Sequence, residues 1–279
     1  MPPMVGGILY EHGHRMVATF VGLLTTVLAV LIWHRESRKW MRLLGLVALG
    51  MVITQGVLGG ITVIYLLPTP VSVSHATLAQ TFFCVTVLLA FATSREWSEA
   101  VARPHVDCHR LRFAAVAAML AIYVQLILGA VVRHTGSALA IPDFPLAFGG
   151  LIPPFAETSV VLHFAHRLWA LSVTGAVAWL GYRISRHEPR ERLFRRPAML
   201  LACLIVAQIL LGGTIVWTSR AVLPATAHVA TGALLLATTW LLTLRTYLHL
   251  EPVDGVRVGG NHALVRACRG ILFPRPFRG

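Results

Sequence analysis

The sequence predicts an all-α polytopic membrane protein, with seven transmembrane helices from a duplicated four-helix bundle and the first helix of the first repeat missing. Three observations lead to this fold class. The 279 residues are 56% hydrophobic and only 13% charged, with a mean hydropathy of +0.72, which lies outside the range of soluble globular domains. Seven apolar runs are long enough to cross a bilayer. Finally, two halves of the chain repeat the same polar motifs at a nearly constant offset.

Short polar loops separate the seven predicted spans. The spans cover about 14–33, 43–67, 72–93, 113–132, 159–182, 198–218 and 222–244. Arginine and lysine concentrate in alternate loops and after the last span, whereas the opposite loops hold only Arg133 and Arg220. Because positively charged loops stay in the cytoplasm, we expect a cytoplasmic C-terminus and a chain that begins on the outer side of the cell (inner) membrane.

The net charge of +13 could indicate nucleic-acid binding. Its confinement to loops between apolar spans argues against nucleic acid and for contact with membrane lipid. The four cysteines, Cys84, Cys108, Cys203 and Cys268, include no C-x-x-C pair. The sequence therefore predicts neither a disulfide framework nor a cysteine metal site.

Matching motifs lie on corresponding spans of the two halves. "EHGHRM" (11–16) corresponds to "HFAHRL" (163–168), "QGVLGG" (55–60) to "QILLGG" (208–213), and "SHATLA" (74–79) to "AHVATG" (227–232). His14 and His166 are 152 residues apart, and His75 and His228 are 153 apart. A parallel duplication is the simplest explanation of these offsets.

A third copy of one motif, "QLILGA" at 125–130, would have its first-half partner upstream of Met1. We therefore expect the first helix of the first repeat, and its outer loop, to be absent from this chain. The predicted organisation is a three-helix half at 1–97, a cytoplasmic linker at 98–112, a four-helix bundle at 113–246 and a cytoplasmic tail at 247–279.

Four histidines, His14, His75, His166 and His228, hold equivalent places near the outer ends of four spans. A histidine within a span is costly and usually faces the bundle interior. Two imidazoles from facing helices can ligate a haem iron from both sides, whereas zinc needs three or four converging ligands. The repeat offers two per half, which favours haem. The alternative is a hydrogen bond from each histidine to a neighbouring helix. It requires the free-energy cost of a histidine within a span to be offset separately at four matched positions.

The residue that precedes the first histidine of each pair by three positions differs between the halves. Glu11 precedes His14, whereas His163 precedes His166; a spacing of one helical turn places each on the face of the following histidine. Only one half has a carboxylate at this position. This suggests that it handles protons beside its haem, while the other half passes an electron. The alternative for Glu11 is an exposed acid that the helix dipole favours.

Arg15 and Arg167 directly follow the first histidine of each pair. A guanidinium group suits the carboxylates of haem propionates, and snorkelling to lipid phosphate is an equally good interpretation. Glycines in the spans, such as Gly129, are explained most simply by close helix packing. Histidines of cytoplasmic stretches, including His105 and His249, are interpreted as solvated.

Five motifs in this order resemble the haem A synthase family. They are E-x-x-H-R at 11–15, "SHATLAQ" at 74–80, "LGAVVRHTGSALAIPDFPLAFG" at 128–149, "HFAHRL" at 163–168 and "LPATAHVATG" at 223–232. The resemblance runs from about residue 3 to 245, which is nearly the whole membrane portion. Each motif alone is weak, but their order together with the duplication is specific.

The resemblance implies an oxidoreductase that converts haem O to haem A, oxidising a ring methyl to a formyl group, for assembly of terminal cytochrome oxidase. It implies that His14 and His75 flank the substrate haem with Glu11 as the catalytic acid, and that His166 and His228 hold a haem b. Haem O would be supplied by a haem O synthase. The electron acceptor and the oxygen source stay open, as does assembly into a homo-oligomer.

Two departures from the family pattern affect these expectations. Without the first helix and a "TGSGL"-type outer loop, the substrate half would be open on one side, and we expect reduced activity. The cysteine pair that some members carry in an outer loop has no counterpart here. Two rival functions stay open: a bis-histidine membrane cytochrome that moves electrons between quinol and a partner, and a haem carrier without turnover.

Overall fold

The computed structural model describes residues 7–187 and 192–253, and the side chains within 12–186 and 192–253. Seven helices in these ranges are long and apolar enough to cross a membrane, which confirms the predicted number. The spanning helices are α1 (Gly7–Arg35), α2 (Lys39–Ile64), α3 (Thr69–Ala92), α5 (Cys108–His134), α6 (Thr158–His187), α7 (Arg192–Trp217) and α8 (Val222–His249). The short elements are α4 (Arg95–Ser98), η1 (Ser137–Leu139), β1 (Arg103–His105) and β2 (Leu250–Pro252).

Most helices extend beyond the apolar runs that predicted them. For example, α5 begins at Cys108 instead of 113, and α8 continues to His249 instead of 244. A helix satisfies its own backbone hydrogen bonds, so it continues past the hydrocarbon region into residues that polarity would assign to a loop. The tail after residue 253, with Cys268, lies outside the described residues.

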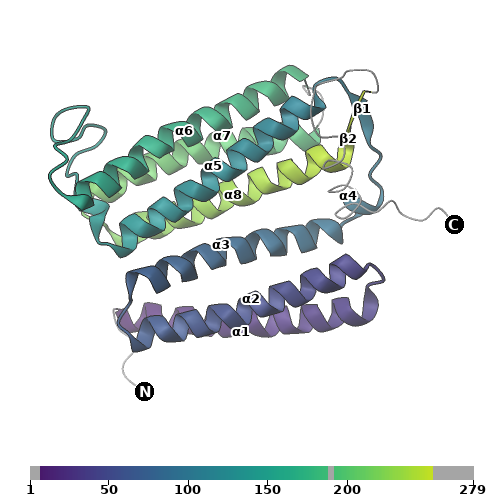
Figure 1. Cartoon of the computed structure of the whole chain (residues 1–279), viewed down its shortest axis with the longest axis horizontal. Helices are drawn as coiled ribbons and strands as arrows, with labels where there is room; N and C mark the ends of the chain where they lie inside the picture. The colour runs from purple at the N-terminus through teal and green to yellow at the C-terminus, as the bar shows by residue number, and fades with distance from the viewer. Residues whose placement is uncertain (1–6, 188–191, 254–279) are drawn as a thin grey trace. The chain divides into compact units, whose positions relative to one another are not determined.

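The chain divides into two compact units, Met1–Leu89 and Ala90–Gly279. In the second unit, α5 packs on α6 and α8, and α7 packs on the same two helices. The result is a four-helix bundle in which α6 and α8 stand on a diagonal (Figure 1). Three alanines of α5, Ala114, Ala115 and Ala118, are completely buried, and such small residues allow helices to approach closely in a membrane.

Arginine side chains close one end of this bundle. Arg112 is only 5% exposed; its guanidinium donates to the carbonyls of Thr246 (3.2 Å) and Leu250 (2.6 Å). The last carbonyls of a helix lack intrahelical donors, so Arg112 satisfies the end of α8. Arg112, at the end of the predicted cytoplasmic linker 98–112, thus belongs to α5. Strands β1 and β2 pair in parallel at the same end.

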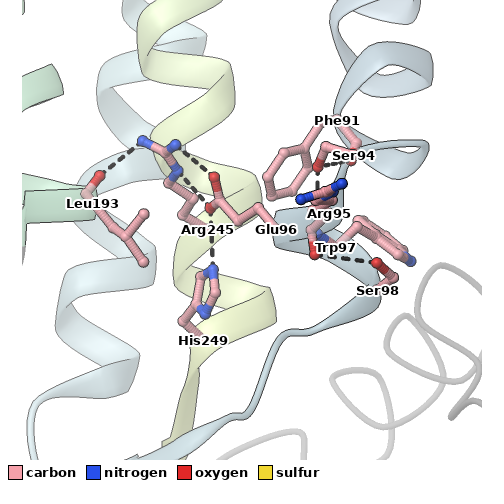
Figure 2. Close-up of polar contacts among 9 residues, drawn as sticks. All are labelled: Phe91, Ser94, Arg95, Glu96, Trp97, Ser98, Leu193, Arg245 and His249. Carbon is pink, nitrogen blue, oxygen red and sulfur yellow. Dashed lines mark hydrogen bonds and ion pairs between the residues drawn. The ribbon is translucent and has the colours of Figure 1, made fainter.

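A second cluster at this end joins α4, α7 and α8 (Figure 2). Arg245 donates to both carboxylate oxygens of Glu96, at 2.8 and 2.7 Å, and to the carbonyl of Leu193 at 2.8 Å. His249 Nε2 lies 3.1 Å from Oε1 of Glu96, and its side chain is 14% exposed. Burial raises the pKa of Glu96, but the hydrogen bonds from Arg245 and His249 outweigh it, so the net shift is downward. The interpretation of His249 as solvated was therefore wrong.

In the first unit, α1 packs on α2. Met41 and Ala48 of α2 are buried, and Gly45 lets Ile32 of α1 approach within contact distance. In the turn between the helices, Arg38 donates to both oxygens of Glu36 and lowers the pKa of that carboxyl to about 2.

Candidate functional site

The two predicted ligand histidines of the second unit come from diagonal helices. His166 lies in the first turns of α6 and His228 in the first turns of α8. Both helices start at the end opposite the Arg112 cluster, because they run in the same direction. The two histidines are therefore at similar depth in the bundle.

Each of these histidines contacts a glutamine and a glycine of a neighbouring helix. Gln125 of α5 donates to the carbonyl of His166 at 3.0 Å, and its amide nitrogen lies 3.5 Å from the ring atom Nε2. A methyl group at Gly129 would lie 3.1 Å from Cε1 of His166. Around His228, the amide nitrogen of Gln208 on α7 lies 3.2 Å from Nε2.

The first unit shows the same contacts around one histidine of its pair. Gln55 of α2 donates to the carbonyl of His75 at 3.0 Å, and a methyl group at Gly59 would lie 3.4 Å from Cε1 of His75. The rings of His14 and His75 lie close together and tilted, with centroids 6.4 Å apart and planes inclined by 59°. The structure thus brings together the two histidines predicted to flank the substrate.

The centroid distance can be compared with axial ligation of one metal ion. A ligating imidazole nitrogen lies about 2.0 Å from the metal, and about 1.1 Å from its ring centroid, so two rings that ligate one ion in line would have centroids roughly 6.2 Å apart. The 6.4 Å between His14 and His75 matches this spacing. The spacing of the two rings therefore leaves room for one metal ion between them.

Arg167 anchors the loop after α5 to α6. Its guanidinium donates to the carbonyls of Leu146 (2.9 Å) and Ile141 (3.3 Å), and its Nε lies 3.1 Å from Nε2 of His163. The backbone N–H of Ile141 lies 3.2 Å from the other ring nitrogen of His163. A neutral imidazole accepts at one nitrogen only, so one of these two contacts is a hydrogen bond at a time. Sequence reasoning missed this role of Arg167.

Phe144, in the same loop, packs against the bundle. Its ring contacts Trp217 edge-on with centroids 5.9 Å apart, and the indole of Trp217 donates to the carbonyl of Phe144 at 3.3 Å. A methyl group at Gly213 would lie only 2.7 Å from the ring. Gly213 therefore makes room for a loop side chain, which the sequence pattern alone did not indicate.

The loop is also closed on itself by Asp143. Its carboxylate accepts the backbone N–H groups of Phe148 (2.7 Å) and Gly149 (2.8 Å), both at positive φ. These bonds, chiefly the one from Gly149, lower the pKa of Asp143.

The two other predicted site residues of the first unit, Glu11 and Arg15, both belong to α1. Glu11 belongs to α1, three residues before His14, but its side chain lies outside the described residues. Arg15 is exposed on α1 beside His14. Their predicted roles stay predictions.

Comparison with known proteins identifies the family. The model of the COX15-CtaA family, described as cytochrome oxidase assembly protein, matches residues 6–240, a range that includes both histidine pairs. The chain belongs to this family.

Individual relatives agree with the family match. The chain is 33% identical over 219 residues to the haem A synthase of Symbiobacterium thermophilum, which covers 76% of this chain and 70% of that protein. It is 27% identical over 246 residues to the haem A synthase of Listeria innocua, which covers 87% and 77% of the two chains. The haem A synthase of Shouchella clausii is 27% identical over 220 residues. The motif-based assignment to the haem A synthase family is thus confirmed.

The donor set of this haem A synthase family member fits haem. Among the described residues, the Nδ1 atoms of His75, His166 and His228 are buried without a hydrogen-bond partner. A neutral imidazole has a lone pair on one nitrogen only, so a ring that ligates a metal gives up any hydrogen bond which that lone pair accepts. No group of three or more His, Cys, Asp or Glu side chains that could hold a metal ion occurs in the part of the chain that the structure describes. Two protein ligands per site suit haem better than zinc.

Proposed function

We propose that this protein is an oxidoreductase, a haem A synthase that oxidises a ring methyl of haem O to a formyl group and so provides haem A for terminal cytochrome oxidase. The observation that carries the proposal is the spacing of 6.4 Å between the ring centroids of His14 and His75. The family match and the names of the relatives support the same reaction. Haem O is the substrate in this proposal, supplied by a haem O synthase.

The two units have different roles in the proposal. In the first, His14 and His75 hold the iron of haem O, and Glu11 accepts or donates a proton beside it. In the second, His166 and His228 would hold a haem b. Bound there, haem b would supply an electron carrier that stays with the protein.

The oxidation balances as R–CH3 + H2O → R–CHO + 4 H+ + 4 e−. A water route releases protons beside the substrate, where a carboxylate such as Glu11 can accept one. Stepwise hydroxylation takes the oxygen atom from dioxygen instead. In both routes the imidazoles of His14 and His75 orient the haem.

Two arginines are proposed partners of the haem propionates. Arg15 follows His14 and is exposed, so its side chain can reach a carboxylate at the membrane surface. Arg167 donates to loop carbonyls, which places its guanidinium at the same end of α6 as His166. We place this end at the outer face of the cell (inner) membrane and the Arg112 cluster at the cytoplasmic face, because arginine concentrates there.

The direct test is to incubate the purified protein with haem O and an electron acceptor, and to analyse the extracted haems. A formyl-bearing product is the expected result. Unchanged haem O with normal redox cycling would instead identify a bis-histidine cytochrome, and bound haem O without either behaviour would identify a carrier.

Glu11→Ala tests the proton-handling role. We expect haem binding to persist and turnover to fall about 10²–10⁴-fold, the range for loss of general acid–base catalysis. Glu157→Ala is the matched control, because Glu157 is an exposed acid beside the start of α6 and carries the same charge. Undiminished turnover in Glu11→Ala would remove this residue from the mechanism.

A further inference from the structure

A glutamine and a glycine four residues later face a candidate ligand histidine three times in this chain. The three sets are Gln55, Gly59 and His75; Gln125, Gly129 and His166; and Gln208, Gly212 and His228. A spacing of four residues puts both side chains on one helix face, about 6 Å apart along the axis. We call each glutamine–glycine pair a Gln–Gly cradle.

The glycine of each cradle faces the edge of the imidazole. An added methyl would lie 3.4 Å from Cε1 of His75 at Gly59, 3.1 Å from Cε1 of His166 at Gly129, and 3.4 Å from Cε1 of His228 at Gly212. The same ring atom is nearest in all three cases.

General helix packing does not account for these glycines. Gly60, directly beside Gly59, and Gly175 in α6 have nothing within 4 Å of an added methyl. Had the glycines served only close helix approach, the nearest atoms would belong to many kinds of side chain. Close helix packing alone, the simplest explanation from the sequence, therefore does not explain why all three cradle glycines face an imidazole.

The glutamine of each cradle contacts the same histidine from the same helix as the glycine. Its amide nitrogen, which can only donate, contacts the carbonyl of His75 or His166, or Nε2 of His228. In all three cradles the glutamine Oε1 and the histidine Nδ1 are buried without a partner among the described residues. The same two atoms are left unsatisfied each time, although unsatisfied buried polar atoms are rare.

We propose that the three Gln–Gly cradles are positioning elements, which fix the rotation of the imidazoles about the Cβ–Cγ bond and so decide how each ring presents its nitrogen to a haem iron. This inference rests on the proposed haem sites. Partners behind a metal ligand orient the ring and tune the metal, and for haem they are one of the protein's means of setting the spectrum and potential.

The test compares Gly129→Ala with Gly175→Ala in the full-length protein purified with its bound haem. The readouts are haem content and the electron paramagnetic resonance signal of low-spin ferric haem, which responds to the relative orientation of the two axial rings. Alanine forms helix better than glycine, so neither variant weakens its helix. We expect Gly129→Ala to bind haem about 10–100-fold more weakly and to shift the signal, while Gly175→Ala matches the wild type.

Gln125→Met provides the second measurement, because it keeps the volume and removes the amide. It should also shift the low-spin signal. If Gly129→Ala does not accumulate in membranes, Gly212→Ala takes its place, since its added methyl lies 3.4 Å from His228. Unchanged haem content and signal in the glycine and glutamine variants together would overturn the inference.

The outcomes separate this inference from the proposed function. If no haem A is made from haem O but the low-spin signal responds to the cradle variants, the positioning role stands and the proposed reaction fails. If haem A is made and the low-spin signal is the same in the cradle variants as in the wild type, only the inference fails. A wild-type protein without low-spin haem would contradict both.

Discussion

Replacing Glu96 by glutamine should destabilise the second unit. The carboxylate accepts two hydrogen bonds from Arg245, at 2.8 and 2.7 Å, and lies 3.1 Å from His249 Nε2 (Figure 2). Glutamine keeps the shape but has one acceptor oxygen and no charge. The guanidinium of Arg245, only 14% exposed, would then lose its ionic partner.

The size of the effect follows from the burial of this cluster. Exposed ion pairs contribute about 0–1 kcal/mol, and removing one partner of a fully buried pair costs about 3–5 kcal/mol. Glu96 is 21% exposed and its partners 14%, so solvent screens the cluster in part. We expect the free energy of unfolding to fall by about 2 kcal/mol, roughly 4–8 °C in Tm for a unit of this size.

The assay is thermal unfolding of the detergent-solubilised protein, followed by loss of helical circular dichroism. Glu99→Gln is the matched control, because Glu99 is exposed and lies three residues away in the same stretch. Since the pKa of Glu96 is lowered in the folded protein, its contribution is present above the unfolded pKa of about 4.3 and disappears as the pH falls through the lower, folded pKa. The difference between the wild type and Glu96→Gln should therefore shrink in acid. Equal Tm values for Glu96→Gln and Glu99→Gln at neutral pH would refute the reasoning.

Two further predictions concern the second unit. His228→Ala should abolish the low-spin spectrum of the resident haem in the purified protein, whereas His249→Ala, at the opposite end of α8, should keep it; a normal spectrum in His228→Ala would remove that residue as a ligand. In the loop, hydrogen–deuterium exchange should show the amides of Phe148 and Gly149 protected at neutral pH and released as the pH falls through the lowered pKa of Asp143. In Asp143→Asn the protection should be weaker and independent of pH, and a wild-type profile in that variant would contradict the assignment.

Hydrophobicity alone was sufficient for the number of spans. A bilayer offers no hydrogen bonds to the backbone, so an apolar run of sufficient length has to be helical. The repeat then placed His14, His75, His166 and His228 near corresponding helix ends, because positions along a helix follow directly from residue number.

Side-chain environments were not accessible in the same way. His249 was interpreted as solvated, but it contacts Glu96, and Arg112 of the predicted linker caps the end of α8. Gln208 stood in a quoted motif without any role. Each of these contacts joins segments far apart in the chain, and no local pattern records which pairs will meet.

The sequence by itself determined the membrane class, the seven spans, the family and the histidines that carry the proposed chemistry, since all of these depend on local composition and on motif order. Only the tertiary structure decided that the rings of His14 and His75 lie 6.4 Å apart, that Gly129 faces an imidazole and Gly213 a loop phenylalanine, and that Arg167 holds a loop. The physical reason is that the rotation of each helix about its axis is set by packing against its neighbours, and this rotation selects which side chains meet.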